Sequence, residues 1–213
     1  MAASPPARLR ADARRNRDKI VAAAVVAFGD DGPYLPMEEI ARRAGVGVGT
    51  LYRHFPDRDA LIVAVVRDSL ETMLARAREA EAEEPRAWDA LVRTMTGSQE
   101  LRLTLRIPNL FLPVTGEAIR ADPVVMQIRG ELTALIDGLV RAAQREGSLR
   151  PDVGTGDVIH LFWLLLRGLK EMPGALADAA YDRARGVILD GLRARPGGAL
   201  PGRALTIGDL NPL

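Results

Sequence analysis

The stretch that decides the fold runs from Met37 to Leu61 and reads MEEIARRAGVGVGTLYRHFPDRDAL. Apolar residues recur at helical spacing on each side of a glycine, before it at Met37, Ile40 and Ala44, and after it at Val48, Leu51, Tyr52 and Phe55. Gly45 can adopt the left-handed backbone conformation that ends one helix and lets the chain turn into the next. Two short helices joined in this way form a helix-turn-helix, which sets its second helix into the major groove of DNA. The sequence therefore predicts a helix-turn-helix motif over about residues 37–55.

Helices are also predicted on both sides of this motif. The preceding one carries a buried stripe of Ile20, Ala24, Ala27 and Phe28, and the turn residues 30–33 end it. Asp57 is placed to cap the following one, and Glu83, Glu84 and Pro85 close it. Its apolar stripe consists of Ile62, Val66, Leu70, Met73 and Ala77. We expect a DNA-binding head over residues 12–60, with the fourth helix linking it to a body, and a disordered basic tail over residues 1–11.

The rest of the chain is also expected to be helical, over residues 61–195. Segments 87–98 and 101–107 favour helices, and Asp122 and Pro123 begin a long one. That long helix carries the stripe Val125, Ile128, Leu132, Leu135, Leu139 and Ala143, and the last helix carries Tyr181, Ala184, Ile188 and Leu192. Pro-Gly signals predict a flexible C-terminal tail over residues 196–213. The predicted fold class is all-α, a three-helix head with a larger helical body.

Composition limits the class of protein. The chain has 213 residues, 47% of them hydrophobic and 27% charged, which is typical of a globular protein. It has no cysteine, which excludes disulfides and thiolate zinc sites and fits a reducing compartment. The basic N-terminus has no apolar stretch behind it, so no secretory signal is expected. The strongest apolar run, Leu161 to Leu166, is too short to span a bilayer. We therefore expect a cytoplasmic protein.

Charge is unevenly distributed along the chain. Residues 1–29 hold six basic and two acidic residues, a net charge of +4, so the remainder carries −3 of the overall +1. A basic end on a mildly acidic body suits a protein that touches phosphate at one end. A solvated basic tail is the alternative interpretation, because charge alone is a general signal.

The third helix presents polar residues outward. With Val48, Leu51 and Phe55 inward, Gly49, Thr50, Arg53 and His54 fall near the outer face and Tyr52 at its edge. Gly49 inside a short helix costs about 1 kcal/mol relative to alanine. Close approach of the helix to DNA would account for it, and tight helix packing is the alternative. Hydroxyl, imidazole and guanidinium groups hold phosphates, and an arginine can also read a guanine edge.

The segment from Gly49 to Phe55, with Arg58 and Leu61 after it, closely resembles the head of the tetracycline-repressor (TetR) family. The resemblance runs from about Arg14 to Leu70, a third of the chain. It implies a homodimer with an all-helical body and contacts to DNA, mostly its backbone, by Thr50, Tyr52, His54 and Arg58. The candidate DNA-binding residues are Val48, Gly49, Thr50, Tyr52, Arg53, His54 and Arg58. Pro36 stands where many members have a serine or threonine cap, so contacts at that point can differ.

The remaining sequence patterns do not indicate a nucleotide-binding, catalytic or metal site. The glycines between Gly45 and Gly49 follow a helix and lack the spacing of nucleotide-binding loops. His160 on an apolar helix favours a core or interface role over a ligand or base, and the pair Glu38 and Glu39 favours solvated surface. No nucleophile elbow and no metal-ligand cluster occurs. We expect no catalytic residues, metal or cofactor, and no enzymatic activity.

The body offers a set of bulky residues for a ligand cavity, with ordinary core as the alternative for each one. They are Trp88, Leu91, Met95, Leu105, Phe111, Met126, Phe162 and Trp163. Together they suit an apolar or amphipathic ligand, and Arg102, Arg106 and Arg129 could also take part. The stretch 158–169 is apolar nearly all round, which predicts burial. With the last helix it could form half of a four-helix dimer interface, or it could be a core helix of a monomer.

These patterns lead to a functional hypothesis. We expect a homodimeric, sequence-specific regulator, a repressor released from a palindromic operator by a small apolar or amphipathic effector. A DNA-binding dimer controlled by abundance or by a protein partner is the main alternative. A small helical enzyme is a remote one, since the sequence supplies no acid–base or nucleophile cluster for it.

Overall fold

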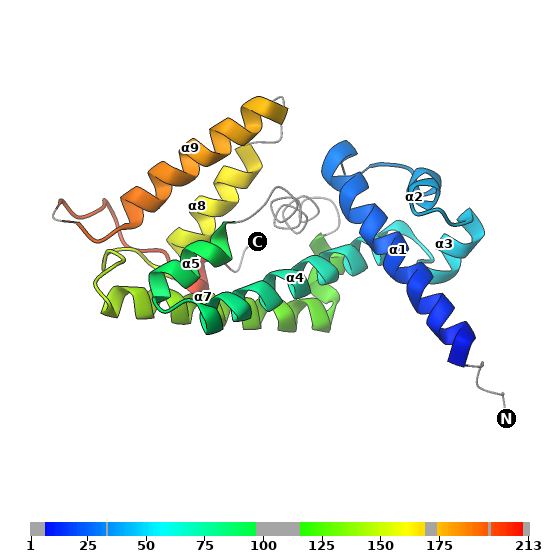
Figure 1. Cartoon of the computed structure of the whole chain (residues 1–213), viewed down its shortest axis with the longest axis horizontal. Helices are drawn as coiled ribbons and strands as arrows, with labels where there is room; N and C mark the ends of the chain where they lie inside the picture. The colour runs from blue at the N-terminus through cyan, green and yellow to red at the C-terminus, as the bar shows by residue number, and fades with distance from the viewer. Residues whose placement is uncertain (1–6, 33, 97–115, 169–173, 196, 211–213) are drawn as a thin grey trace.

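The computed structural model describes residues 7–32, 34–96, 116–168, 174–195 and 197–210 (Figure 1). Its described elements are α1 (Ala7–Asp31), α2 (Met37–Arg43), α3 (Val48–His54), α4 (Arg58–Glu83), α5 (Ala87–Met95), α7 (Pro123–Arg145), α8 (Thr155–Gly168), α9 (Gly174–Leu192) and the 3-10 helix η2 (Ile207–Leu210). Within these ranges there is no strand, only a single antiparallel bridge between Leu149 and Arg193. The all-α prediction is confirmed. The predicted helix 101–107 lies outside the described residues.

The first four helices follow the predicted apolar stripes. Ile20, Ala24 and Phe28 on α1 are fully buried, and Ile40 and Leu51 close the same core from α2 and α3. Helix α1 lies across the first turns of α4, and α2 and α3 form the far end of the molecule (Figure 1). The head is thus built around α1, which contacts the other three helices.

Two aspartates begin the long helices as predicted. The Asp57 carboxylate accepts a hydrogen bond from the Ala60 amide at 2.7 Å, and the Asp122 carboxylate accepts one from Val125 at 2.9 Å. Each bond satisfies an amide that has no partner within its own helix. Asp122 also accepts a 2.7 Å hydrogen bond from Arg67 of α4. Burial raises the pKa of Asp122, but these donors outweigh burial and lower it overall.

Helices α4 and α7 run side by side in the same direction and form the floor of the body (Figure 1). Ion pairs of 2.7 Å mark their register, Arg67 with Asp122 near the head and Arg78 with Glu131 further along. Helix α5 packs against both. None of the helices in the described ranges has the length and apolar character needed to cross a membrane.

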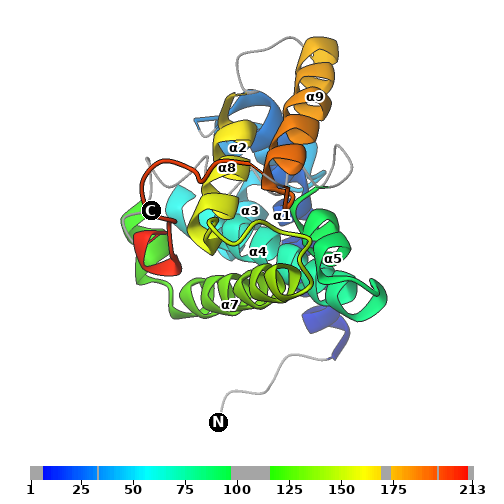
Figure 2. The same ribbon diagram turned by 90° about the vertical axis from the view of Figure 1, so that its left-hand side faces the viewer.

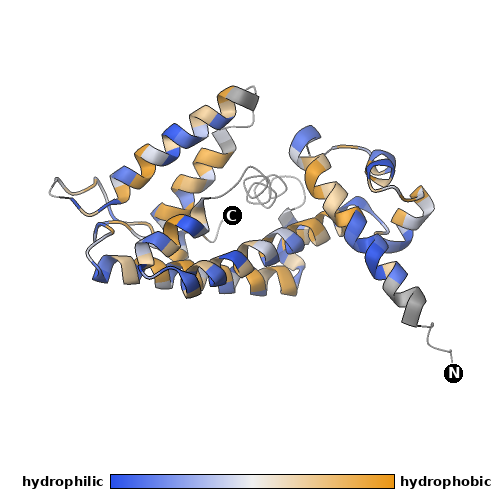
Figure 3. Ribbon diagram, in the orientation of Figure 1, coloured by the Kyte–Doolittle hydropathy of each residue, from blue (hydrophilic) through white to orange (hydrophobic). Residues whose placement is uncertain are grey.

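Helix α1 begins earlier than expected. The prediction of disorder over residues 1–11 is wrong for residues 7–11, which are helical. Alanine, leucine and arginine there are strong helix formers, so the helix extends into the basic segment. Between residues 12 and 19 this end of α1 is hydrophilic and projects beyond the core of the head (Figure 3).

The C-terminal segment is also more ordered than predicted, since residues 197–210 pack onto the body instead of forming a flexible tail. The Gly156 amide donates to the Leu205 carbonyl at 2.9 Å, and the Asp157 carboxylate accepts from the Leu205 amide at 3.0 Å. The fit excludes a side chain, because a Cβ on Gly156 would lie 2.6 Å from the Thr206 carbonyl oxygen. Figure 2 shows this segment (red) leading from α9 to η2 beside α7. We call residues 197–210 the strap.

Helix α8 is not buried all round within one chain, which corrects the prediction for residues 158–169. It buries Val158, Phe162 and Leu166 on one face. On other faces Leu161 is 36% and Leu164 53% exposed. The neighbouring α9 exposes Leu176 and Val187, so apolar residues are visible on both helices in Figure 3. The described part of α8 therefore leaves apolar surface that this chain does not cover.

Replacing Gly156 by alanine should detach the strap. Alanine is the better helix former, so the substitution acts through the clash with Thr206 and not through α8 itself. We expect faster hydrogen exchange of the Leu205 amide, measured by mass spectrometry. Gly138→Ala on α7 is the matched control, because a Cβ there meets nothing within 4 Å. It should leave the strap protected and stabilise the protein by up to about 1 kcal/mol. Unchanged protection in Gly156→Ala would contradict the packing described.

Candidate functional site

The turn between α2 and α3 is fixed by backbone hydrogen bonds around Gly45. Its φ of 66° lies in the left-handed region, where glycine has no side-chain penalty. The Gly45 amide donates to the Arg42 carbonyl at 3.2 Å and the Val46 amide to the Ala41 carbonyl at 3.0 Å. This pair of bonds is a Schellman motif, which ends a helix and sends the chain off at a set angle. Gly45 therefore has the role that the sequence predicted.

Helix α3 turns one face inward and leaves the other open. Leu51 is fully buried and Phe55 is 3% exposed. Val48 and Tyr52 are 39% and 42% exposed, so the expectation that Val48 points inward is wrong. Val48 lies in the first turn, where the helix begins to leave the core. The open face therefore carries Val48, Gly49, Tyr52 and Arg53.

The surroundings of Gly49 bear on the packing explanation for that glycine. A Cβ on Gly49 would meet no heavy atom within 4 Å. Packing inside this chain therefore does not require a glycine at this position. Close approach of this helix to DNA stays a prediction for Gly49.

Polar side chains of α3 lie along this open face. The Arg53 guanidinium donates to the Gly49 carbonyl at 3.2 Å and to the Thr50 hydroxyl at 2.9 Å. Arg53 must release these bonds to reach a base edge. Arg17 of α1 lies 5.7 Å from the centre of the Phe55 ring, a cation–π contact between α1 and the end of α3. His54 is half-buried beside that ring and Arg58 opens α4, so the predicted DNA-contact residues share one region of the head.

Pro36 is the N-cap residue of α2 and makes no side-chain capping bond. Acidic residues in the first turn compensate, because they interact favourably with the helix dipole. Glu39 also bonds Arg42 at 2.6 Å and Arg43 at 2.8 Å, and Arg43 reaches Asp31 of α1 at 2.7 Å. Glu39 is thus a surface residue, but one that is engaged in ion pairs. Arg42 and then Arg43 lower its pKa to about 2.

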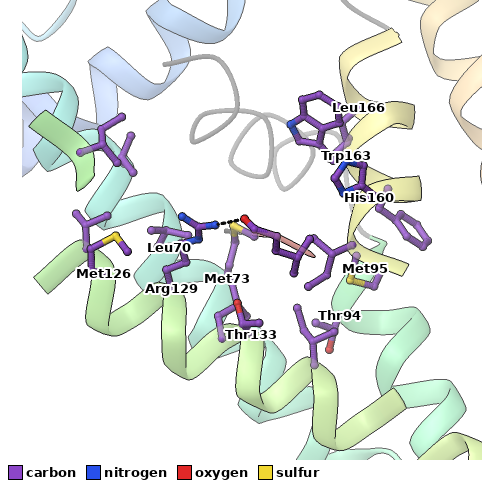
Figure 4. Close-up of a pocket in the computed structure, with 18 residues that line it drawn as sticks. Leu70, Met73, Thr94, Met95, Met126, Arg129, Thr133, His160, Trp163 and Leu166 are labelled. Atoms are coloured by element: carbon purple, nitrogen blue, oxygen red, sulfur yellow. Dashed lines mark hydrogen bonds between the residues drawn. The ribbon is translucent and has the colours of Figure 1, made fainter. Parts of the chain in front are cut away.

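The body contains a second candidate site, a cavity of ≈ 180 Å³ between α4, α5, α7 and α8 (Figure 4). An apolar protein cavity of about 150 Å³ is large enough to bind benzene. Its walls are mainly apolar and comprise Val66, Leu70, Met73, Thr94, Met95, Ile119, Val125, Met126, Arg129, Leu132, Thr133, Ile136, Ile159, His160, Phe162, Trp163, Leu166 and Leu210. Val66 and Leu70 belong to α4, the helix that also supports the head.

The structure places the predicted pocket residues in three groups. Met95, Met126, Phe162 and Trp163 line the cavity. Trp88 and Leu91 are 2% and 3% exposed in the core and do not line it, because the cavity lies only at the C-terminal end of α5. Trp88 instead lies under the Arg193 guanidinium, 4.8 Å from its ring centre. Leu105, Phe111, Arg102 and Arg106 lie outside the described residues.

Several polar groups in the cavity wall are informative. Arg129 is the one charged side chain among the described residues that line it, and it donates to the Leu210 carbonyl at 2.9 Å. Burial, and then the charge of Arg120, lower the pKa of Arg129. His160 lines the cavity beside Trp163, and among the described residues its buried Nδ1 has no hydrogen-bond partner. The sequence favoured a core or interface role for His160, and the structure shows that its side chain also lines the cavity.

Sequence reasoning missed the lining by Thr94, Ile119, Thr133, Ile136, Ile159 and Leu210. The sequence did predict apolar stripes on α4 and α7, but it assigned them to the core and not to a cavity wall. Stripes facing a core and stripes facing a cavity have the same periodicity. Leu210 was missed because it comes from a segment that was expected to be flexible.

Known protein families match both parts of the chain. Residues 20–65 match the family described as bacterial regulatory proteins, tetR family, and residues 110–194 match the C-terminal domain of SbtR-like transcriptional regulators. The HTH-type transcriptional regulator UidR of Escherichia coli strain K12 is 29% identical over 198 residues, which cover 90% of this chain and 96% of UidR.

Solved structures give the same result. The TetR transcriptional regulator SCO0520 from Streptomyces coelicolor is 30% identical, with a TM-score of 0.61 over 84% of this chain and 98% of that one. A TetR transcription regulatory protein from Mycobacterium vanbaalenii is 35% identical, with a TM-score of 0.56 over 87% of this chain and 99% of that one.

Gly49→Ala should make the protein more stable and weaken its binding to DNA. Alanine in an exposed helix should raise the free energy of unfolding by up to about 1 kcal/mol, measured by urea denaturation. The new methyl group should hinder close approach to DNA and weaken binding by roughly tenfold, about 1.4 kcal/mol, in a fluorescence-anisotropy titration. Equal DNA affinity in the two proteins would argue that nothing approaches this face closely.

The Glu39 cluster predicts an acid-dependent loss of stability. Since the pKa of Glu39 is about 2 in the folded protein, well below its ordinary value, its contribution is complete above about pH 4.5 and declines as the pH falls toward 2. NMR titration of the Glu39 side chain should give the low pKa directly. In Arg42→Gln and in Arg43→Gln the pKa should move upward. A value near 4.5 in the unsubstituted protein would contradict the ion pairing.

Proposed function

Because this chain belongs to the tetR family of bacterial regulatory proteins and is a DNA-binding transcriptional regulator, we propose that it acts as a homodimeric repressor. A small apolar or amphipathic molecule in the body cavity releases it from a palindromic operator. Its site of action is the cytoplasm, where the operator lies. The observation that carries the release step is that α4 both lines the cavity and supports the head.

The DNA contacts come from the open face of α3 and the start of α4. Arg53 reads a base edge, and Thr50, Tyr52, His54 and Arg58 hold phosphates. Val48 and Gly49 bring the helix against the groove. The exposure of Val48, Gly49, Tyr52 and Arg53 supports this assignment.

The dimer forms through α8 and α9. Leu164, Leu176 and Val187 are 53%, 57% and 72% exposed, and contact with a second copy would remove their apolar surface from water. Two copies related by a two-fold axis present two α3 helices to successive major grooves, about 34 Å apart or a multiple of that distance. An operator with inverted half-sites follows from that symmetry.

The effector acts by favouring a state that does not fit the operator. Release requires that the effector bind this state more tightly than the DNA-bound state. Val66 and Leu70 contact the effector, and the same helix carries Leu61 and Ile62 in the core of the head. A shift of α4 therefore changes the position of α3 in each subunit and the separation of the two recognition helices.

A mobility-shift titration with the DNA upstream of the protein's own gene tests the DNA contacts. Tyr52→Ala combined with Arg53→Ala should weaken binding by roughly ten- to a hundredfold, because base and phosphate contacts are lost together. Binding by the unsubstituted protein should fall steeply with salt. Arg145→Ala removes the same charge from an exposed position on α7 and should change little. Full binding by the double variant would exclude the proposed face.

A thermal-shift panel separates effector control from its main alternative, a dimer regulated by abundance or by a protein partner. A molecule that binds only the folded protein raises its melting temperature, and a true effector also releases DNA. Stabilisation without DNA release, or no stabilisation by any compound, would favour the alternative.

A further inference from the structure

The core-facing side of α1 changes its character along the helix. In the C-terminal half this side is apolar, and Val21, Ala24 and Phe28 are between 0% and 3% exposed. Toward the N-terminus the same side continues, at spacings of three and four residues, through the positions of Arg17, Arg14 and Arg10. Figure 3 shows the corresponding change from apolar to hydrophilic along α1. The side of the helix that packs on the head therefore continues beyond it as a row of arginine positions.

Arg17 marks the point at which this row leaves the head. Its guanidinium lies over the ring of Phe55, which is the C-cap residue of α3, and Arg58 begins α4 three positions later. The row thus leaves the head beside the junction of α3 and α4, at the edge of the proposed DNA face. An α-helix rises about 1.5 Å per residue, so positions 14 and 10 lie about 5 and about 10 Å beyond Arg17. Figure 1 shows this end of α1 projecting on the side away from the body.

Two neighbouring arginines at this end of α1 have different surroundings. Arg15 forms an ion pair with Asp12 on another side of the helix. Arg14 is exposed, and no ion pair within the described part of the chain involves it. Binding to DNA releases counterions only for phosphates that a cationic side chain neutralises. Arg14, whose charge no carboxylate of the chain offsets, is the better placed of the two for a phosphate.

We propose that α1 adds a second DNA-contact surface, in which Arg14 and Arg10 bind phosphates next to those assigned to Arg58. The inference rests on the proposed DNA face of α3 and extends it beyond the helix-turn-helix. A reach of about 10 Å corresponds to about three base pairs, since phosphates follow one another by about 3.4 Å along a strand. Contacts to phosphate carry no sequence information, so this surface adds affinity and not specificity.

Fluorescence-anisotropy titrations of full-length protein with DNA over a range of salt concentrations test the contact. Arg14→Gln should weaken binding roughly three- to tenfold at about 0.1 M salt. The slope of log affinity against log salt should fall by about 2, because each copy in a dimer loses about one phosphate contact. The loss should be similar on the DNA upstream of the protein's own gene and on an unrelated duplex of roughly 40 base pairs. The second duplex makes the test independent of where the operator lies.

Arg15→Gln is the matched control, because it removes the same charge one position away on another side of the helix. Both residues are exposed and glutamine is a good helix former, so neither substitution should lower the melting temperature. The exposed pair that Arg15→Gln breaks adds little stability. This variant should change the affinity by less than about twofold and keep the salt slope. Equal effects of the two substitutions would indicate general attraction between charges and overturn the contact. Unchanged binding by Arg14→Gln would overturn it as well.

The variant that combines Tyr52→Ala with Arg53→Ala separates this inference from the proposed DNA face. If that variant loses binding and Arg14→Gln does not, the face of α3 stands and the contact from α1 is wrong. If that variant keeps full binding and Arg14→Gln loses it, the face of α3 is wrong and the contact from α1 is supported. A loss in Arg14→Gln on only one of the two duplexes would indicate base recognition and overturn the assignment to phosphate.

Discussion

The packing of α4 against two sets of partners is the interaction on which the rest of the structure depends. Leu61 and Ile62 are fully buried in the head, and Leu74 and Ala77 are buried in the body four turns further on. Between them the same helix lines the cavity through Val66 and Leu70. Protein cores are close-packed and hardly compress, and a helix transmits a shift along its axis. The proposed release depends on this arrangement, because α4 is anchored in the head within a few turns of the cavity.

Contacts inside the head hold its helices in place, while the outer face of α3 stays exposed. Gly45 sets the angle between α2 and α3, Phe55 is held beneath Arg17, and the Glu39 cluster ties α2 to α1. None of these contacts uses the outer face of α3. A Cβ added at Gly49 would meet no heavy atom within 4 Å, so the surface is bare at this point. In the proposed release, a head held in this way moves as a unit, so that a shift of α4 changes the placement of α3 without changing its shape.

The features that the sequence predicted well are local. The Asp57 and Asp122 caps and the turn at Gly45 depend on residues a few positions apart, and apolar stripes report which face of a helix is buried. The strap could not be predicted, because Gly156 and Leu205 meet across 49 positions and proline–glycine composition indicates only a turn. The cavity was found in part for a related reason. Periodicity shows that Met95 and Trp88 face inward, but not whether the space beneath each is filled.

Helix α8, like α4, faces two different surroundings, the cavity on one side and the surface of the chain on another. Phe162, Trp163 and Leu166 face the cavity, and Leu164 lies exposed on the same helix. This explains why its sequence is apolar nearly all round although one chain covers only part of it. In a dimer built on α8 and α9, the partner holds α8 in place. In the proposed release, α4 is then the wall that connects the cavity to the head.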